Sequence, residues 1–112
     1  MSQSVSEVTD ATFEREVLEA GGAAVVDFGA PWCPPCRAME PIFAELGGRF
    51  DGSARFFKLN IDDNPAVAQR YGVKGIPTFI VFDGGREVER VVGAIGKEAL
   101  ARIVSKYATV AA

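Results

Sequence analysis

The chain has 112 residues, 48% of them hydrophobic, which fits one domain over residues 1–112 and leaves no room for a second. Its formal net charge of −3 and its lack of a basic cluster argue against nucleic acid or an anionic membrane as a partner. The sequence shows no secretory signal and no run of about 18 apolar residues, so we expect a cytoplasmic protein without a membrane span.

The first third of the chain predicts a strand, a helix and a second strand. Residues 5–8 fit a short edge strand, and Asp10 is a plausible N-cap for a helix over residues 11–20. The apolar residues at core spacing in that helix are Phe13, Val17 and Leu18. Residues 23–28 are apolar on both faces, as expected of a central strand that helices cover on both sides.

The middle of the chain predicts a βαβ unit followed by a short helix. A helix over about residues 33–50 connects the apolar strand to a further strand over residues 54–61. Pro41 lies inside this helix, where proline costs about 3 kcal/mol unless the loss is compensated, and we assign it a structural role. Asn64-Pro65 supplies an N-cap and a favoured first residue for a helix that ends at Tyr71-Gly72.

The last third predicts a hairpin and a closing helix. Strand-like runs over residues 78–82 and 87–92 are joined through Asp83-Gly84-Gly85-Arg86, a pattern typical of an antiparallel hairpin. Residues 97–107 follow as a helix, whose inner face carries Leu100, Ile103 and Val104. Together the elements predict an α/β fold, in which a βαβ unit and a ββα unit share one central mixed sheet with helices on both faces.

Both cysteines lie in Trp32-Cys33-Pro34-Pro35-Cys36, where the second predicted helix begins. Cysteines three positions apart in a helical turn lie within the roughly 4.4–6.8 Å between Cα atoms that a disulfide requires. The pattern favours a redox-active pair. A structural disulfide or dormant thiol pair is the first alternative, although so short a loop gains only roughly 2 kcal/mol. A metal or cluster bridged between two chains is the second, since one chain has two Cys and no His.

Several segments, in this order and at these separations, resemble the thioredoxin family. They are Asp27-Phe28, Trp32-Cys33 with Pro35-Cys36, Pro41, Lys58 to Asp62, Tyr71-Gly72-Val73 and Gly75-Ile76-Pro77-Thr78. The resemblance covers nearly the whole chain. It implies the thioredoxin fold and an enzyme, a protein-disulfide reductase that works by thiol–disulfide exchange without a metal or other cofactor. A thiol oxidase or disulfide isomerase of the same fold is one alternative, and a non-catalytic thioredoxin-fold binding subunit is another.

The resemblance also implies partners, namely a thioredoxin reductase or an equivalent electron donor and proteins that contain disulfides. We expect the protein itself to be a monomer. Family members often carry Gly-Pro between the cysteines and a Trp before the active-site loop. Pro34 and Gly29 depart from that pattern, so the resemblance does not set the reduction potential.

The two cysteines are assigned different roles. At the N-cap, the sulfur of Cys33 can accept the N–H of Cys36 and faces the positive end of the helix dipole, and both effects favour the thiolate. We therefore predict Cys33 as the nucleophile and Cys36, one turn inside the helix and shielded, as the resolving thiol. Pro34 and Pro35 fit the helix start, where the first N–H groups have no intrahelical acceptor.

Asp27 is the one ionisable group in its apolar strand. Burial raises the pKa of a carboxyl group, and a carboxylate near neutrality can take the proton of Cys36, the role that the resemblance assigns to the matching Asp. A purely structural carboxylate is the alternative. Lys58, on the adjacent predicted strand, either reaches Asp27 and tunes its pKa or extends to solvent.

Pro77 carries the second part of the site. Only about 5–6% of X-Pro bonds are cis in folded proteins, so local sequence favours trans, whereas the resemblance implies a cis bond with the proline against the cysteines. The backbone of Ile76 can then pair with an extended substrate segment. The predicted rim around Cys33 consists of Trp32, Gly75, Ile76, Pro77, Gly93 and Ala94, of which Gly93 and Ala94 also fit a simple turn.

Overall fold

The computed structural model describes residues 4–109, and its elements follow the predicted order with one exception. They are β1 (Val5–Glu7), the π-helical turn η1 (Glu14–Leu18), β2 (Ala23–Gly29), α1 (Pro34–Arg49), β3 (Arg55–Asn60), α2 (Pro65–Arg70), β4 (Thr78–Asp83), β5 (Arg86–Val92) and α3 (Lys97–Ser105). No helix within residues 4–109 is long and apolar enough to cross a membrane.

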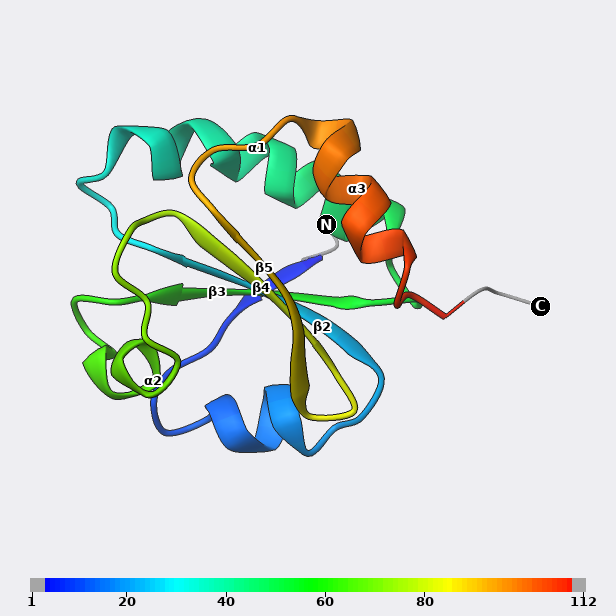
Figure 1. The fold of residues 1–112 in the computed structure, drawn as a ribbon, viewed down its shortest axis with the longest axis horizontal. Helices are drawn as coiled ribbons and strands as arrows, with labels where there is room; N and C mark the ends of the chain where they lie inside the picture. The colour runs from blue at the N-terminus through cyan, green and yellow to red at the C-terminus, as the bar shows by residue number, and fades with distance from the viewer. Residues whose placement is uncertain (1–3, 110–112) are drawn as a thin grey trace.

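The strands form one mixed sheet in the order β1-β3-β2-β4-β5. β1 and β2 each run parallel to β3, whereas β4 is antiparallel to both β2 and β5. α1 and α3 cover one face of this sheet, and η1 and α2 cover the other (Figure 1). This confirms the predicted α/β architecture, in which the unit β2-α1-β3 and the unit β4-β5-α3 share the sheet.

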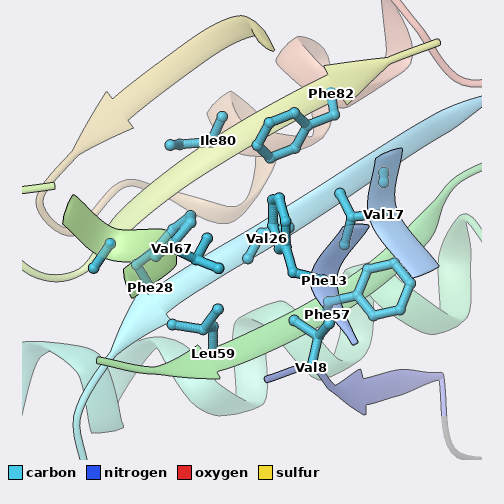
Figure 2. Packing of buried hydrophobic residues seen from close by; sticks show 12 residues of the cluster. Val8, Phe13, Val17, Val26, Phe28, Phe57, Leu59, Val67, Ile80 and Phe82 are labelled. Atoms are coloured by element: carbon cyan, nitrogen blue, oxygen red, sulfur yellow. The ribbon is translucent and has the colours of Figure 1, made fainter. Parts of the chain in front are cut away.

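β2 lies at the centre of the sheet and is buried along nearly its whole length. Its side chains alternate between the two faces, as in any strand. Val26 and Phe28 join the cluster beneath η1 and α2, which Figure 2 shows from close by. Val25 joins the cluster beneath α1 and α3. The alternation therefore directs Asp27 and Gly29 toward α1.

Aromatic packing holds α1 on its face of the sheet. The ring of Phe43 lies 4.8 Å from the ring of Phe56 on β3 and 5.7 Å from that of Phe79 on β4, measured between centroids. Such pairs contribute about 0.5–1.5 kcal/mol each beyond the burial of their area. α1 runs without interruption through Pro41. The helix that carries the cysteines is thus fixed to the two strands that flank β2, the strand that carries Asp27.

The hairpin and the two later helices agree with the sequence. β4 and β5 are joined by Gly84 and Gly85, whose φ angles of 61° and 83° lie in the left-handed region that a two-residue hairpin requires. α2 has Asn64 at its N-cap position and Pro65 as its first residue, as predicted. α3 ends at Ser105, slightly earlier than expected, with Leu100 and Val104 fully buried.

The first helix was predicted with the correct core residues, since Phe13 and Val17 are buried, but with the wrong type, bounds and cap. Residues 11–20 do not form one α-helix, and Asp10 does not cap one, because a turn precedes the short η1. The Asp10 carboxylate instead accepts hydrogen bonds from the N–H groups of Ala66 and Val67, at 3.0 and 2.9 Å, in the first turn of α2. Asn64 makes no side-chain cap and accepts the Asp10 N–H at 2.9 Å.

This contact predicts that Asp10→Ala will destabilise the fold, since it leaves two N–H groups of the first turn of α2 without their acceptor. Loss of a capping carboxylate costs about 1–2 kcal/mol, and the free energy of unfolding should fall by that amount in a urea titration. Asp51→Ala is the matched control, because Asp51 is exposed in the turn after α1 and its side chain makes no hydrogen bond within residues 4–109. An equal loss in both variants would contradict the cap.

Candidate active site

The two cysteines are joined as a disulfide at the start of α1, with their Cα atoms 5.2 Å apart. Cys33 is the N-cap, and its sulfur accepts the N–H of Cys36 at 3.2 Å. Pro34 and Pro35 occupy the first two helical positions and have no N–H, so the Cys36 amide is the first backbone donor of the helix. The predicted N-cap placement of Cys33 is confirmed. One directed hydrogen bond and the helix dipole together favour a negative charge on this sulfur.

Both cysteines are buried, with 3% of Cys33 and 6% of Cys36 exposed. Cys36 is shielded, as expected, but in this oxidised form Cys33 is shielded equally. Exposure therefore does not separate the nucleophile from the resolving thiol. The feature that separates them is the N-cap, which belongs to Cys33 alone, so the assignment of roles rests on that contact.

Ile76, the residue before Pro77, lies against Cys33. The Ile76-Pro77 peptide bond is cis, which confirms the expectation from the resemblance. The carbonyl oxygen of Ile76 lies 4.0 Å from the sulfur of Cys33, a contact rather than a hydrogen bond because a disulfide sulfur carries no hydrogen. The side chain of Ile76 also packs against the two cysteines and Ala30.

The other predicted rim residues are placed unevenly. Trp32 is 65% exposed, and its indole N–H donates to a carboxylate oxygen of Asp62 at 2.6 Å. Gly93 donates its N–H to the carbonyl of Pro77 at 2.7 Å, which brings the end of β5 beside the cis-proline. Gly75 borders Val92, an apolar residue that is 63% exposed. Ala94 is exposed, and no hydrogen bond within residues 4–109 joins it to the other rim residues.

Asp27 is buried beneath the disulfide, with 6% of its surface exposed. Its Oδ1 atom has no hydrogen-bond partner within residues 4–109. Burial raises the pKa of Asp27 from 3.8 to about 7, while the charge of Lys58 lowers it and that of Glu40 raises it. Asp27 is therefore a carboxyl group that changes charge near neutral pH.

Asp27 and Cys36 line the same cavity, which has a volume of about 150 Å³. A Cβ atom at Gly29 would lie 3.2 Å from the sulfur of Cys36 and 3.6 Å from Oδ1 of Asp27. The Cys36 sulfur and the Asp27 Oδ1 atom thus both lie within 4 Å of the position that a Cβ atom of residue 29 would take, and glycine has only a hydrogen there. A side chain at this position would crowd the Cys36 sulfur at the wall of the cavity, which Gly29 lines.

Lys58 lies beside Asp27 in the register of β2 and β3. Its side chain is exposed, and it forms no ion pair with Asp27 in the described part of the chain. It lines the cavity and acts on the pKa of Asp27 through its charge alone. The exposed side chain agrees with the interpretation that the lysine extends to solvent, and its role in tuning Asp27 stays a prediction.

Sequence reasoning missed three residues that belong to this site. Asp62 holds the indole of Trp32, Val92 extends the apolar rim, and Glu40 lines the cavity opposite β2. Asp62 lies in the segment Lys58 to Asp62, which resembles the thioredoxin family, but no local pattern shows that its carboxylate accepts a hydrogen bond from Trp32. Glu40 and Val92 look like ordinary surface residues until the helix and strand are placed. Within residues 4–109 no group of three or more Asp, Glu, Cys or His is arranged to hold a metal ion.

Comparison with known proteins agrees with the geometry. The thioredoxin family model matches residues 4–106. The chain is 44% identical over 104 residues to a thioredoxin of Pyropia yezoensis, a match that covers 93% of this chain and 97% of that protein. It is 43% identical over 102 residues to thioredoxin 1 of a Nostoc species, covering 91% and 95% of the two chains. With thioredoxin 1 of Synechococcus elongatus the identity is 45% over 100 residues, covering 89% and 94%.

The cysteine pair lies at the start of the first long helix over a mixed sheet, and Ile76, whose bond to Pro77 is cis, lies against Cys33. The sequence matches agree with this arrangement. The chain belongs to the thioredoxin family and is a protein-disulfide oxidoreductase that reduces disulfides by thiol–disulfide exchange.

Proposed function

We propose that Cys33 makes the first attack on a substrate disulfide. The observation that carries this proposal is the hydrogen bond from the Cys36 amide to the Cys33 sulfur. A thiol with a pKa near 8.5 is only about 3% ionised at pH 7, so a group that stabilises the thiolate raises the reactive fraction. The Cys33 thiolate forms a bond to one substrate sulfur, the substrate disulfide breaks, and the other sulfur leaves as a thiolate and takes a proton from solvent.

Cys36 completes the reaction with help from Asp27. The Asp27 carboxylate takes the proton of the Cys36 thiol, and the Cys36 sulfur then attacks the sulfur of Cys33. The bond between Cys33 and the substrate breaks, and the second substrate sulfur leaves as a thiolate. Two electrons have passed from the dithiol to the substrate, and the Cys33–Cys36 disulfide remains. The shared cavity and the pKa of Asp27 near 7 support this role.

The substrate is seated on the rim around Cys33. An extended segment of a disulfide-containing protein pairs with the backbone of Ile76, next to the cis-proline. Trp32 and the apolar residues near Gly75 and Gly93 contact the side chains of that segment. Pro34 and Pro35 have no N–H groups, so the Cys36 amide is the first N–H of the helix that can donate a hydrogen bond to the Cys33 sulfur.

A protein that gives electrons on each turnover must be reduced again. We assign this to a thioredoxin reductase or an equivalent donor, acting on the Cys33–Cys36 disulfide of a monomer. A reducing compartment such as the cytoplasm suits this cycle, because there the dithiol form is maintained. The chain would then work in electron transport and in cell redox homeostasis.

The reduction potential tests the direction of the reaction. Equilibration with dithiothreitol or glutathione buffers should give a value near −270 mV, typical of a thioredoxin that donates electrons. A value of about −120 to −180 mV would instead favour a thiol oxidase or disulfide isomerase of the same fold. The measurement is best repeated on Pro34→Gly, since this variant restores a backbone donor beside Cys33 and shows how much of the potential depends on it.

A further inference from the structure

We propose that Gly29 keeps open a hydrated passage through which Asp27 exchanges its proton with solvent, and that Glu40 on the rim is a positioning residue that sets the pH of this exchange. The inference rests on the proposed role of Asp27 as the proton acceptor for Cys36. It concerns Gly29, which has no side chain, and Glu40, which carries a negative charge.

The first observation is the orphaned oxygen at the inner end of the cavity. Only 6% of the surface of Asp27 is exposed, and its Oδ1 atom has no hydrogen-bond partner within residues 4–109. Asp27 nevertheless lines a cavity of about 150 Å³. A buried carboxyl oxygen without a hydrogen bond is costly, whereas water in a polar cavity satisfies such atoms. Because water takes about 30 Å³ in the liquid, the cavity has room for several molecules.

The second observation is the position of Gly29. A Cβ atom there would approach the Cys36 sulfur to 3.2 Å and Oδ1 of Asp27 to 3.6 Å. Any side chain would therefore occupy space in the cavity wall that borders both the atom that loses the proton and the atom that accepts it. Glycine is not needed here for its backbone, because its φ does not lie in the left-handed region. Its effect is to leave this space to solvent.

The third observation is the ring of charges at the mouth of the cavity. Asp27 is faced by Glu7 from β1, by Lys58 from β3, and by Glu40 and Cys36 from α1, whereas its β4 neighbour is the apolar Phe79. Glu7, Glu40 and Lys58 are exposed, while Asp27 and Cys36 are buried. The negative charge of Glu40 opposes ionisation of Asp27, and the positive charge of Lys58 favours it. Burial is the main reason why Asp27 holds a proton near neutral pH, and Glu40 adds to that effect, while the passage lets the proton leave.

The proton path closes the cycle. Asp27 becomes a neutral acid when it takes the proton of Cys36, and it must lose that proton before it can accept another. Through the passage the proton moves from Asp27 to water and then to bulk solvent at the rim. No electrons move in this step, and the carboxylate is restored.

The test is an NMR titration of the Asp27 side-chain carboxyl carbon in the oxidised protein, where neither cysteine titrates. Glu40→Gln should lower the pKa of Asp27 by about half a unit, the order expected for one charge removed across a partly aqueous gap. Lys58→Met should raise it by a similar amount. Gly29→Ala should also raise it, by about 0.5 to 1 unit, since a methyl group displaces water from the carboxyl.

Matched controls separate these effects from general changes in charge or helix content. Glu45→Gln removes the same charge from the same helix, but Glu45 pairs with Lys97 on the surface and does not line the cavity. Gly48→Ala adds the same methyl group to α1, where it would meet only Ser4 Oγ at 3.8 Å. Neither control should move the Asp27 titration. If Glu40→Gln moves it no more than Glu45→Gln, or Gly29→Ala no more than Gly48→Ala, the inference is overturned.

A kinetic measurement on the reduced protein distinguishes this inference from the role of Asp27 itself. In the single-turnover release of substrate from the mixed disulfide, the pH midpoint should move down in Glu40→Gln, and Gly29→Ala should slow release at least about threefold at pH 7. Were Asp27→Asn to release substrate at the wild-type rate, the proton-acceptor role would fail. The titration shifts would still decide whether Gly29 and Glu40 control the Asp27 carboxyl.

Discussion

Cys33→Ser will abolish the reduction of insulin by dithiothreitol, with a rate at least about 10³-fold below that of the parent. A serine hydroxyl at the N-cap can accept the hydrogen bond from the Cys36 amide, as the sulfur does, so the fold should be kept. It cannot attack a disulfide at neutral pH, because it is neither ionised nor a sulfur nucleophile. The precipitation of insulin, followed by turbidity, measures the loss directly.

Cys36→Ser is the matched variant, since it removes the same atom from the other end of the pair. The first attack is then preserved and the second is lost, so the protein should accumulate as a mixed disulfide with its substrate through Cys33. Mass spectrometry of the trapped complex identifies the sulfur that made the attack. A complex that forms in Cys33→Ser and not in Cys36→Ser would reverse the two roles, and a Cys33→Ser protein as active as the parent would remove the catalytic role altogether.

Most of the architecture could be predicted from local sequence. The apolar run that became β2, the Gly-Gly turn between β4 and β5, and the Asn-Pro start of α2 each carry their own signal. The cysteine pair could be placed at a helix start for the same reason, because Pro34 and Pro35 are acceptable only where N–H groups lack partners. These predictions depend on neighbours in the sequence.

The predictions that failed depend on partners far away in the sequence. Asp10 looked like the cap of the helix that follows it, but the N–H groups it accepts belong to Ala66 and Val67, more than fifty positions later. The cavity could not be predicted either, since the missing side chain of Gly29 has an effect only once β2 and α1 lie together. Glu40 gains its importance from that same packing. Distant contacts leave no periodic trace in the sequence.

Asp27→Asn will make the protein more stable at pH 8 and less effective in releasing substrate. The pKa of Asp27 is raised from 3.8 to about 7 on folding, so the folded state holds this proton more tightly than the unfolded chain. The stability that the proton contributes is complete below pH 3.8 and is lost as the pH rises through about 7. At 1.36 kcal/mol per pKa unit the whole effect is about 4 kcal/mol, of which roughly 2–3 kcal/mol falls between pH 5 and pH 8.

Asparagine has the same shape and no charge, so this loss should be absent from the variant. Urea titrations of the oxidised proteins should show the free energy of unfolding of Asp27→Asn rising relative to the parent by roughly 2–3 kcal/mol from pH 5 to pH 8. Asp51→Asn removes an exposed carboxylate and serves as the control. A difference between Asp27→Asn and the parent that is the same at every pH would mean that Asp27 does not hold its proton in the folded state.

The same substitution should slow the second chemical step while leaving the first nearly unchanged, because the first attack uses a sulfur that the Cys36 amide already stabilises. General base catalysis by a positioned carboxylate contributes about 10²–10⁴-fold, and release of substrate from the mixed disulfide should fall toward the lower part of that range. Equal slowing of both steps would contradict the role. The buried carboxyl group of Asp27 lowers the stability of the fold at neutral pH and shares a cavity with Cys36. Its removal should therefore make the protein more stable and less active.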